Sequence, residues 1–339
     1  MAKIVRRTIT YKYLPIKPDF LVEGTVIPFD CYIKRFADYV ILIESGTVLN
    51  KELIEKIYLH SKIYVLKREI NTVREYYIAH QKEDSSNPDL GIYKNEIIEN
   101  ASKLDEALSG IDDYDTWLNI VYSKTSELMG VIFNSREEDI PIEPIRSCAI
   151  AITEYIKANK KAMHSVIKIM AAEYSTHHHS TNVAFLCAIL SDAIGLADEE
   201  IIDVTVSGLL HDIGKIRIAP LILNKPASLD DEEYALMKRH PEDGHTILMK
   251  NGVENLTILQ GVLYHHENLD GSGYPSALKG KKVPKSARIV GLCDVFDALT
   301  TKRTFRCNYT TFEALMLMKR ELNSQFDEHY TDLFIRLLR

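Results

Sequence analysis

Histidines and carboxylates gather in the second half of this chain of 339 residues. Nine of its 12 histidines fall between residues 164 and 266. Seven of these stand close to one another or to an acidic residue: His177, His178, His179, His211, His240, His265 and His266. Asp212 directly follows His211, and Asp294 stands in an otherwise apolar stretch. Imidazole and carboxylate ligands suit iron, manganese, zinc or nickel rather than calcium.

Such a ligand set indicates hydrolytic chemistry at a pair of metal ions. Two neighbouring ions activate a water molecule and stabilise the charge that develops on an attacked phosphodiester. This chemistry requires a bridging carboxylate and histidines that arrive from several helices. The sequence supplies both residue types, so it favours a binuclear site.

His211 and Asp212 end an apolar segment that we predict to be a helix opening near Asp198. Two ionisable residues at the buried end of a helix cost free energy unless they are paired or bind metal. Gly214 and Lys215 complete the pattern H-D-x-G-K. The alternative is a plain helix C-terminus, with Gly214 in the left-handed conformation.

His265 and His266 are adjacent, and adjacent residues on a helix point about 100° apart. We therefore expect them to serve two neighbouring ions rather than to hold one ion together. The segment 267–275 that follows contains two glycines, an aspartate and a proline, which predict a tight, shaped loop. The alternative is a pair of histidines on a surface helix that ends in a turn.

Asp294 is predicted to lie on the apolar face of a helix, where a carboxylate needs a partner. Asp297 follows three residues later and is expected near the same face. One of the two can reach a metal ion while the other holds a ligand histidine or caps a helix. The alternative for Asp294 is a solvated acidic face.

The elements that must position these residues differ between the two halves of the chain. Short β-favouring pieces at 31–33, 39–43 and 63–66, with a helix over 52–60 capped by Asn50, predict a small α+β module. From residue 93 onward apolar residues recur at helical spacing, with loops expected near 218–228 and 269–284.

The predicted fold is mainly α, with an all-helical bundle in the C-terminal half and the small α+β module before it. The polar stretch 83–89, which contains a proline, predicts a linker. We divide the chain into an N-terminal module at 1–80, a helical linker region at 81–160 and an enzymatic domain at 161–339.

Composition limits the classes of protein to consider. Hydrophobic residues make up 46% and charged residues 26%, the balance of a soluble globular protein with room for two domains. No apolar run reaches the roughly 20 residues that span a bilayer, and residues 1–15 lack the apolar stretch of a signal peptide. We therefore expect no membrane insertion.

The cysteines and the net charge add two further expectations. None of the five cysteines forms a C-x-x-C pair, which suits a reducing cytoplasm. The net charge of −7 argues against a general nucleic-acid surface, so we expect neither DNA nor RNA as a partner.

Taken in order, the motifs of this half resemble those of the HD-GYP subgroup of HD-domain phosphohydrolases, over about residues 165–335. Seven segments carry the resemblance: His179–Ala184, Leu209–Lys215, Ile222–Pro226, Met237–Pro241, His265–Glu267, Asp270–Pro275 and Asp294–Thr300. The resemblance implies an all-helical bacterial signalling enzyme that hydrolyses cyclic di-GMP to pGpG, and in some members on to GMP, through a metal-activated hydroxide.

The resemblance also implies a ligand set for two divalent ions, most often iron, with manganese as the alternative. Its members here are His179, His211, Asp212, His240, His265, His266 and Asp294. Asp212 would bridge the ions. Members with a third metal carry a glutamate where this chain has Ser175, so we expect two.

Four further residues are implied to contact the substrate. Lys215 would approach the scissile phosphate or the bridging water and so act with Asp212 in catalysis. Tyr274 would pack against a guanine or the ribose-phosphate ring. Arg303 and Arg306 would hold the distal phosphate or a guanine edge, since the guanidinium is bidentate. A solvated helix end is the alternative for both arginines.

This chain departs from the family pattern at three other positions, where Ala227 replaces glycine and Thr304-Phe305 replaces Pro-Tyr. We expect these changes to alter how tightly the substrate is bound without removing a metal ligand. His177 and His178 are expected outside the ligand set, and Glu267 is expected to orient a ligand histidine or the loop.

The N-terminal module resembles the small module that often precedes HD-GYP domains. A sensory or dimerising role, with a second copy or a regulatory protein as partner, is our hypothesis for it. Two other functions stay open: an adaptor that binds cyclic di-GMP with little turnover, and a phosphohydrolase of another cyclic dinucleotide.

Overall fold

The computed structural model describes residues 13–16, 21–35, 38–58, 63–80, 88–135, 137–170, 176–223, 225, 228–301 and 309–338. The chain forms two compact units. The first comprises residues up to 83 together with 217–233, and the second comprises residues 84–216 together with 234–339.

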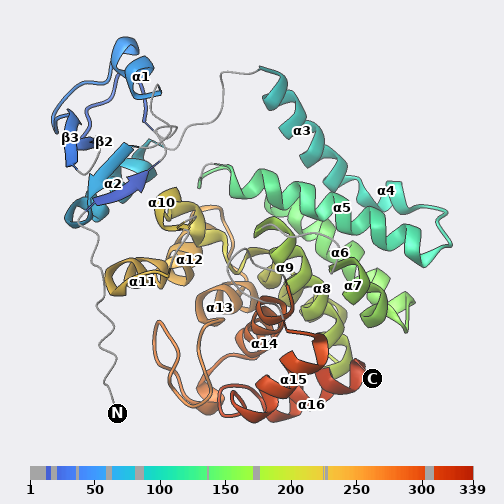
Figure 1. The fold of residues 1–339 in the computed structure, drawn as a ribbon. Coiled ribbons are helices and arrows are strands. Elements are labelled where there is room, and N and C mark those ends of the chain that lie inside the picture. The colour runs from blue at the N-terminus through green and yellow to red at the C-terminus, as the bar shows by residue number, and fades with distance from the viewer. Residues whose placement is uncertain are drawn as a thin grey trace, which may run out of the picture. The chain divides into compact units, whose positions relative to one another are not determined.

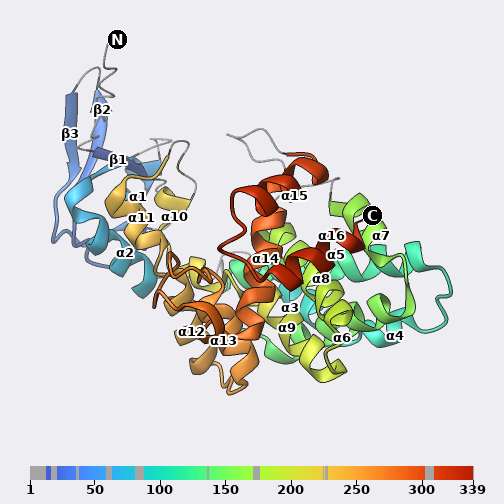
Figure 2. The ribbon, with the colours of Figure 1, turned by 90° about the horizontal axis from the view of Figure 1, so that it is seen from below.

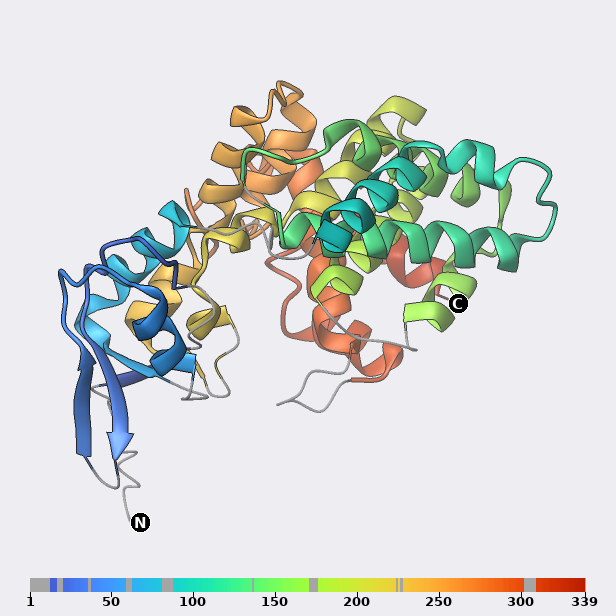
Figure 3. The same ribbon diagram turned by 90° about the horizontal axis from the view of Figure 1, so that it is seen from above.

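The first unit is built on a four-stranded antiparallel sheet in the order β1-β4-β2-β3. The strands are β1 (Tyr13–Ile16), β2 (Cys31–Arg35), β3 (Asp38–Ile43) and β4 (Ile63–Leu66). β2 and β3 run side by side as a hairpin (Figures 2 and 3). Cys31, Tyr32, Ile33, Ile63 and Val65 are buried on these strands and belong to the core of the module.

Helices α1 (Lys51–Tyr58) and α2 (Ile70–Ala79) complete this part of the unit, with the short 3₁₀ helix η2 (Lys67–Glu69) between them. Asn50 caps α1, because its side-chain oxygen accepts from the Leu53 amide at 2.9 Å. The predicted strands, helix and cap are therefore confirmed. β1 was not predicted, because it has only four residues and contains Pro15, which an edge strand tolerates.

Residues 217–233 lie far along the chain but belong to this first unit. They contain the short helix α10 (Pro220–Leu223) and the start of α11 (Asp231–Met237). Ile218, Ala219 and Ile222 are buried, and the fully buried Glu233 forms an ion pair with Lys225. The stretch that separates Asp212 from His240 in sequence is thus anchored in the α+β unit.

The second unit is helical (Figure 1). Its helices are α3 (Pro88–Ser102), α4 (Leu104–Leu108), α5 (Tyr114–Phe133), α6 (Ile142–Ala158), α7 (Ala162–Met170), α8 (Thr176–Ile194), α9 (Asp198–Leu210), α12 (His240–Lys250), α13 (Leu256–Tyr264), α14 (Lys285–Thr300), α15 (Thr311–Arg320) and α16 (Glu328–Leu337). Two 3₁₀ helices, η3 (Ile213–Arg217) and η4 (Gly280–Lys282), lie in the connections. The predicted fold class, mainly helical after a small α+β module, is confirmed.

The centre of this unit is the pair α8 and α9, which pack against each other. Residues 183–190 of α8 are all buried, so this helix is enclosed on every side. α9 begins with three acidic residues, which suit the positive end of the helix dipole, and then buries most of its length. Helices α5, α6, α13 and α14 pack around this pair.

Helices α3 to α6, from the region predicted as a helical linker, share the hydrophobic core of α8 and α9. Polar contacts join them as well: the Tyr122 hydroxyl, for example, donates to the Asn182 side-chain oxygen at 2.7 Å. The division at residues 80 and 160 stays a prediction. Among the described residues, no helix combines the length and apolar character needed to cross a membrane.

Candidate metal centre

The predicted metal ligands meet at the ends and inner faces of the central helices. His179 lies in α8 and Asp294 in α14. His211 and His265 are the residues that end α9 and α13, and His240 is the first residue of α12. The histidines at 211, 240 and 265 are at most 2% exposed, as is Asp212. Burying so many ionisable groups requires mutual pairing or a cation.

These residues form two groups of candidate ligand atoms. His179, His211 and Asp294 make one group, and His240, His265 and His266 make the other, with the ligand atoms of each group within 4.8 Å of one another. The structure therefore has candidate sites for divalent metal.

Asp212 lies between the two groups. Its Oδ2 is 3.4 Å from His211 Nε2 and 3.8 Å from His179 Nε2, and its Oδ1 is 3.3 Å from His240 Nε2. Each carboxylate oxygen thus faces one group. This is the placement that a bridging carboxylate requires.

Backbone carbonyls set the orientation of three histidine rings. Nδ1 of His211, His240 and His265 lies 2.8 Å from the carbonyl oxygen three residues earlier, that of Gly208, Met237 and Val262 respectively. A carbonyl can only accept, so Nδ1 carries the proton and donates it. The other nitrogen, Nε2, is then left with its lone pair toward the centre, as a metal ligand requires.

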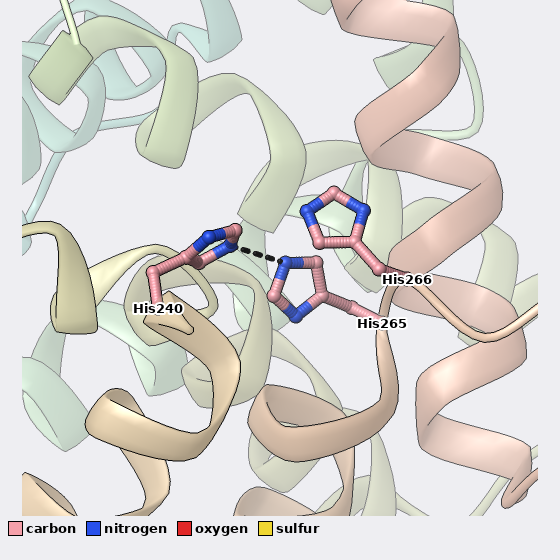
Figure 4. Close-up of side chains that lie close together, drawn as sticks. All are labelled: His240, His265 and His266. Carbon is pink, nitrogen blue, oxygen red and sulfur yellow. Dashed lines mark hydrogen bonds between the residues drawn. The ribbon is translucent and has the colours of Figure 1, made fainter. Parts of the chain in front are cut away.

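His240 Nε2 and His265 Nε2 face each other at 3.2 Å, the contact that Figure 4 marks with a dashed line. Since both rings carry their proton on Nδ1, two lone pairs meet at this point. Burial lowers the pKa of His240 to about 3 and that of His265 well below its ordinary value, so neither ring gains a second proton at neutral pH. A cation between the lone pairs would resolve the contact.

His211 Nε2 gives the same indication in the other group. This nitrogen is buried and has no hydrogen-bond partner among the described residues. Unpaired buried polar atoms are rare and call for a bound group. The donor set and its orientation therefore fit a divalent cation in each group.

His179 differs from the other ligand histidines, because carboxylates flank both of its nitrogens. Nδ1 lies 2.6 Å from Asp297 Oδ2, and Nε2 lies 3.1 Å from Asp294 Oδ1. Burial opposes the charge, but the hydrogen bonds to Asp294 and Asp297 outweigh it and raise the pKa of His179 to about 10. Without a cation this ring carries a positive charge.

Both central carboxylates stay ionised. Burial favours their neutral forms, but Lys215 holds the pKa of Asp212 well below its usual range, and His179 does the same for Asp294. Lys215 Nζ donates to Asp212 Oδ2 at 2.5 Å. The structure thus places Lys215 on a ligand carboxylate.

Three alternatives from the sequence are wrong. Gly214 is not left-handed: it lies in η3, and a Cβ there would come 1.9 Å from the His240 carbonyl oxygen, so glycine is needed for close approach. His265 is buried rather than on a surface helix, and Asp294 is 9% exposed rather than on a solvated face.

The expectation that His265 and His266 serve different ions is not what the structure indicates. Both lie in one group with His240, with their ring centroids 4.1 Å apart. The expected angle of about 100° between the two side chains applies only within a helix. Because α13 ends at Tyr264, His266 lies in a turn, and its ring points toward the same group as the ring of His265.

The loop after the histidines is tight, as predicted. Glu267 is buried and accepts from the amides of Ser276 and Leu278 at 2.6 and 2.8 Å, so it orients the loop. A Cβ at Gly273 would lie 2.5 Å from the His266 carbonyl oxygen. Glycine therefore lets the loop close, and the Tyr274 ring stacks on the His266 ring at 4.7 Å between centroids.

Several predicted positions cannot be placed. Ser175, Ala227, Arg303, Thr304, Phe305 and Arg306 lie outside the described residues, as does the side chain of His177. The His178 ring stacks on that of Tyr122 at 6.1 Å.

Sequence reasoning missed two residues that support the centre. Asn182 Nδ2 and Thr301 Oγ1 donate to Asp297 Oδ1 at 2.9 and 2.8 Å. Asn182 stands three residues after His179, which places it on the same helix face, and that spacing could have indicated its role.

A cavity adjoins the second ligand group. His265, His266 and Tyr274 line it, together with Tyr234 and Lys238. Arg288 and Gln325 lie on its wall as well. The cavity offers aromatic rings and cationic groups beside the candidate metal ligands.

Comparisons with known proteins agree with this geometry. Residues 164–329 match the family model of the HD domain. The chain is 32% identical over 185 residues to cyclic di-GMP phosphodiesterase PA4108 of Pseudomonas aeruginosa, covering 55% of this chain and 44% of that protein. It is 37% identical over 157 residues to the cyclic di-GMP phosphodiesterase response regulator RpfG of Xanthomonas campestris, covering 45% of this chain and 41% of the relative.

Two further matches extend the comparison. A 3′3′-cGAMP-specific phosphodiesterase of Vibrio cholerae is 36% identical over 171 residues, which cover 50% of this chain and 32% of that protein. A solved structure, a protein from Bdellovibrio bacteriovorus described as HDG"Y"P, superposes with a TM-score of 0.57 at 22% identity, covering 96% of this chain and 99% of that one, and shows the same fold.

The chain spans less than half the length of each of these three curated relatives. The matched residues hold all the candidate ligands, in the order that the resemblance to the HD-GYP group required. That resemblance is confirmed, since residues 164–329 match the HD domain family and the relatives at 32% and 37% identity are named cyclic di-GMP phosphodiesterases.

Proposed function

We propose that this chain is a metal-dependent phosphodiesterase that hydrolyses cyclic di-GMP to pGpG, with GMP as a further product. The observation that carries the proposal is the position of Asp212, whose two carboxylate oxygens face two separate groups of candidate ligands. Relatives at 32% and 37% identity that bear the name cyclic di-GMP phosphodiesterase support the substrate.

Two divalent cations would be held by the histidines at 179, 211, 240, 265 and 266 together with Asp212 and Asp294. Iron is the proposed metal, with manganese as the alternative, since imidazole and carboxylate ligands suit both. When bound, such a pair supplies an activated water and stabilises charge on the phosphodiester.

The residues of the chain prepare the centre for this chemistry. Backbone carbonyls and Asp297 hold the imidazoles in the ligand orientation, and burial keeps the site in a low-dielectric environment. Lys215 moderates the charge of Asp212 and is proposed to act with it near the scissile phosphate. Tyr274 covers one edge of the centre, where it would pack against the substrate, and Arg303 and Arg306 are proposed as further contacts.

The test is an assay of protein purified without oxygen and loaded with iron or manganese. We expect cyclic di-GMP to be consumed, pGpG to appear on chromatography, and activity to depend on two equivalents of metal by elemental analysis. Protein that holds two equivalents of metal and leaves cyclic di-GMP intact would contradict the proposal and would favour an adaptor that binds without turnover.

A second candidate substrate is 3′3′-cGAMP, because a relative at 36% identity is named for that activity. Competition between the two cyclic dinucleotides at equal concentration separates the candidates by their kcat/KM ratio. A cytoplasmic location and a sensory or dimerising role for the N-terminal unit complete the proposal.

A further inference from the structure

Lys238 lies in the turn between α11 and α12, two residues before the candidate ligand His240. It lines the cavity that also contacts His265 and His266. Its side chain is half-buried, so the cation sits beside the candidate metal centre.

Two tyrosine rings hold this lysine. Lys238 Nζ is 4.6 Å from the ring centroid of Tyr234 and 5.4 Å from that of Tyr274. Tyr234 stands four residues earlier in α11, and Tyr274 comes from the loop after α13. Both distances lie within the range of cation–π attraction, which stabilises the ammonium without neutralising its charge.

Among the residues that the structure describes, Lys238 has no counterion. Lys215 forms an ion pair with Asp212 at 2.5 Å, whereas no ion pair between described residues includes Lys238. Asp212 and Asp294 are already engaged by Lys215 and the ligand histidines. An unpaired, partly desolvated ammonium in a cavity is complementary to an anionic ligand.

The aromatic surroundings narrow the class of that anion. The Tyr234 side chain is 48% exposed although it lines the cavity, and the Tyr274 ring stacks on the His266 ring. Exposed aromatic faces bind nucleobases by stacking, largely without regard to sequence. A cation beside the exposed Tyr234 ring suits a nucleotide phosphate whose base stacks on that ring.

We propose that Lys238 binds a phosphate of the cyclic dinucleotide other than the one held at the metal ligands, with Tyr234 providing the stacking surface for a base. This inference rests on the proposed function and adds a positioning residue to it. Because the ammonium acts on substrate binding and not on the reacting phosphate, it affects KM rather than kcat.

Two variants test whether the positive charge of Lys238 is what binds the substrate. Lys238→Gln removes the charge, and Lys238→Arg keeps it. We expect Lys238→Gln to raise KM for cyclic di-GMP about tenfold, the effect of losing one charged hydrogen bond, with kcat within about twofold. Lys238→Arg should retain most of the affinity. The KM of the wild type should also rise more steeply with salt than that of Lys238→Gln.

Two controls exclude a general effect on the centre. Metal content should be unchanged in every variant, as should hydrolysis of bis(4-nitrophenyl) phosphate, which has a single phosphate and no base. Lys319→Gln removes an exposed lysine paired with Asp332 and should leave KM unchanged.

The stacking role of Tyr234 is tested separately. Tyr234→Phe should preserve the affinity for cyclic di-GMP, and Tyr234→Leu should reduce it.

Calorimetric titration with cyclic di-GMP tests the contact separately from turnover. Equal affinity of the wild type and Lys238→Gln would overturn the inference, and so would parallel losses against bis(4-nitrophenyl) phosphate, which would indicate a structural role. A further outcome is a wild type that binds cyclic di-GMP without hydrolysing it. If Lys238→Gln then bound cyclic di-GMP more weakly than the wild type, the contact would be supported and only the proposed function overturned.

Discussion

His179 donates from Nδ1 to Asp297 Oδ2 at 2.6 Å, and this contact links α8 to α14 within the candidate metal centre. Asp297 is fully buried, and its other oxygen accepts from Asn182 and Thr301. The carboxylate is therefore held from both sides, and the imidazole has a single orientation.

Asp297→Asn tests this link. The amide oxygen can still accept from Asn182 and Thr301, but the amide nitrogen would then face the N–H of His179. The ring must turn or change tautomer, so we expect metal affinity to fall about 10- to 100-fold. Metal titration followed by elemental analysis gives the affinity. Asp192→Asn, an exposed change in α8, the helix that carries His179, should have no effect, and equal affinity in both variants would contradict the assigned role.

His211→Ala combined with Asp212→Ala removes one ligand and the carboxylate shared by both groups. We expect the loss of most of the bound metal and of all turnover. The wild type should gain thermal stability when manganese is added, because a cation that binds only the folded protein stabilises it. The double variant should show no such gain, and full metal content in it would show that the centre lies elsewhere.

Gly273→Ala should displace the loop without emptying the centre. The added methyl group would lie 2.4 Å from the Asn268 nitrogen, so the backbone must shift and move Tyr274 away from His266. We expect KM to rise severalfold while metal content is kept. Ser272→Ala alters the exposed neighbouring residue without adding a group at this contact. A variant with unchanged KM would show that the stacked position of Tyr274 does not matter for binding.

Metal binding should release a proton from His179. Its pKa of about 10 in the metal-free protein means that Nε2 is protonated at neutral pH, and a cation must displace that proton. Affinity for metal should therefore fall as the pH is lowered, by about tenfold per unit from this group alone. Calorimetry in two buffers of different ionisation enthalpy counts the protons released, and a count of zero would contradict the assignment.

The candidate ligands could be picked out from the sequence because each stands in a local motif, such as His211 before Asp212 at the end of an apolar helix. Helical periodicity likewise predicted the central helices. The contacts between groups were not predictable. Tyr274 meets Lys238 across 36 positions of sequence, and no spacing rule connects a turn before one helix to a loop after another.

The orientation of the imidazoles was also beyond the sequence. The carbonyls of Gly208, Met237 and Val262 accept from the imidazoles because each histidine stands at a helix terminus. The residue at which a helix begins or ends is poorly predicted from sequence, so these hydrogen bonds could not be foreseen. β1 escaped prediction for a related reason, since four residues with a proline become a strand only when β4 pairs with them.

Residues 217–233 are anchored in the α+β unit, while the polypeptide on either side of them carries Asp212 and His240. The two units therefore cannot be separated by a single cut. Deleting residues 1–83 would remove the rest of the unit in which Ile218 and Ile222 are buried, and the segment that holds them leads at its two ends to the candidate ligands Asp212 and His240. Recombination that exchanged the N-terminal part of the α+β unit would have to replace residues 217–233 at the same time. The two segments are therefore expected to evolve together.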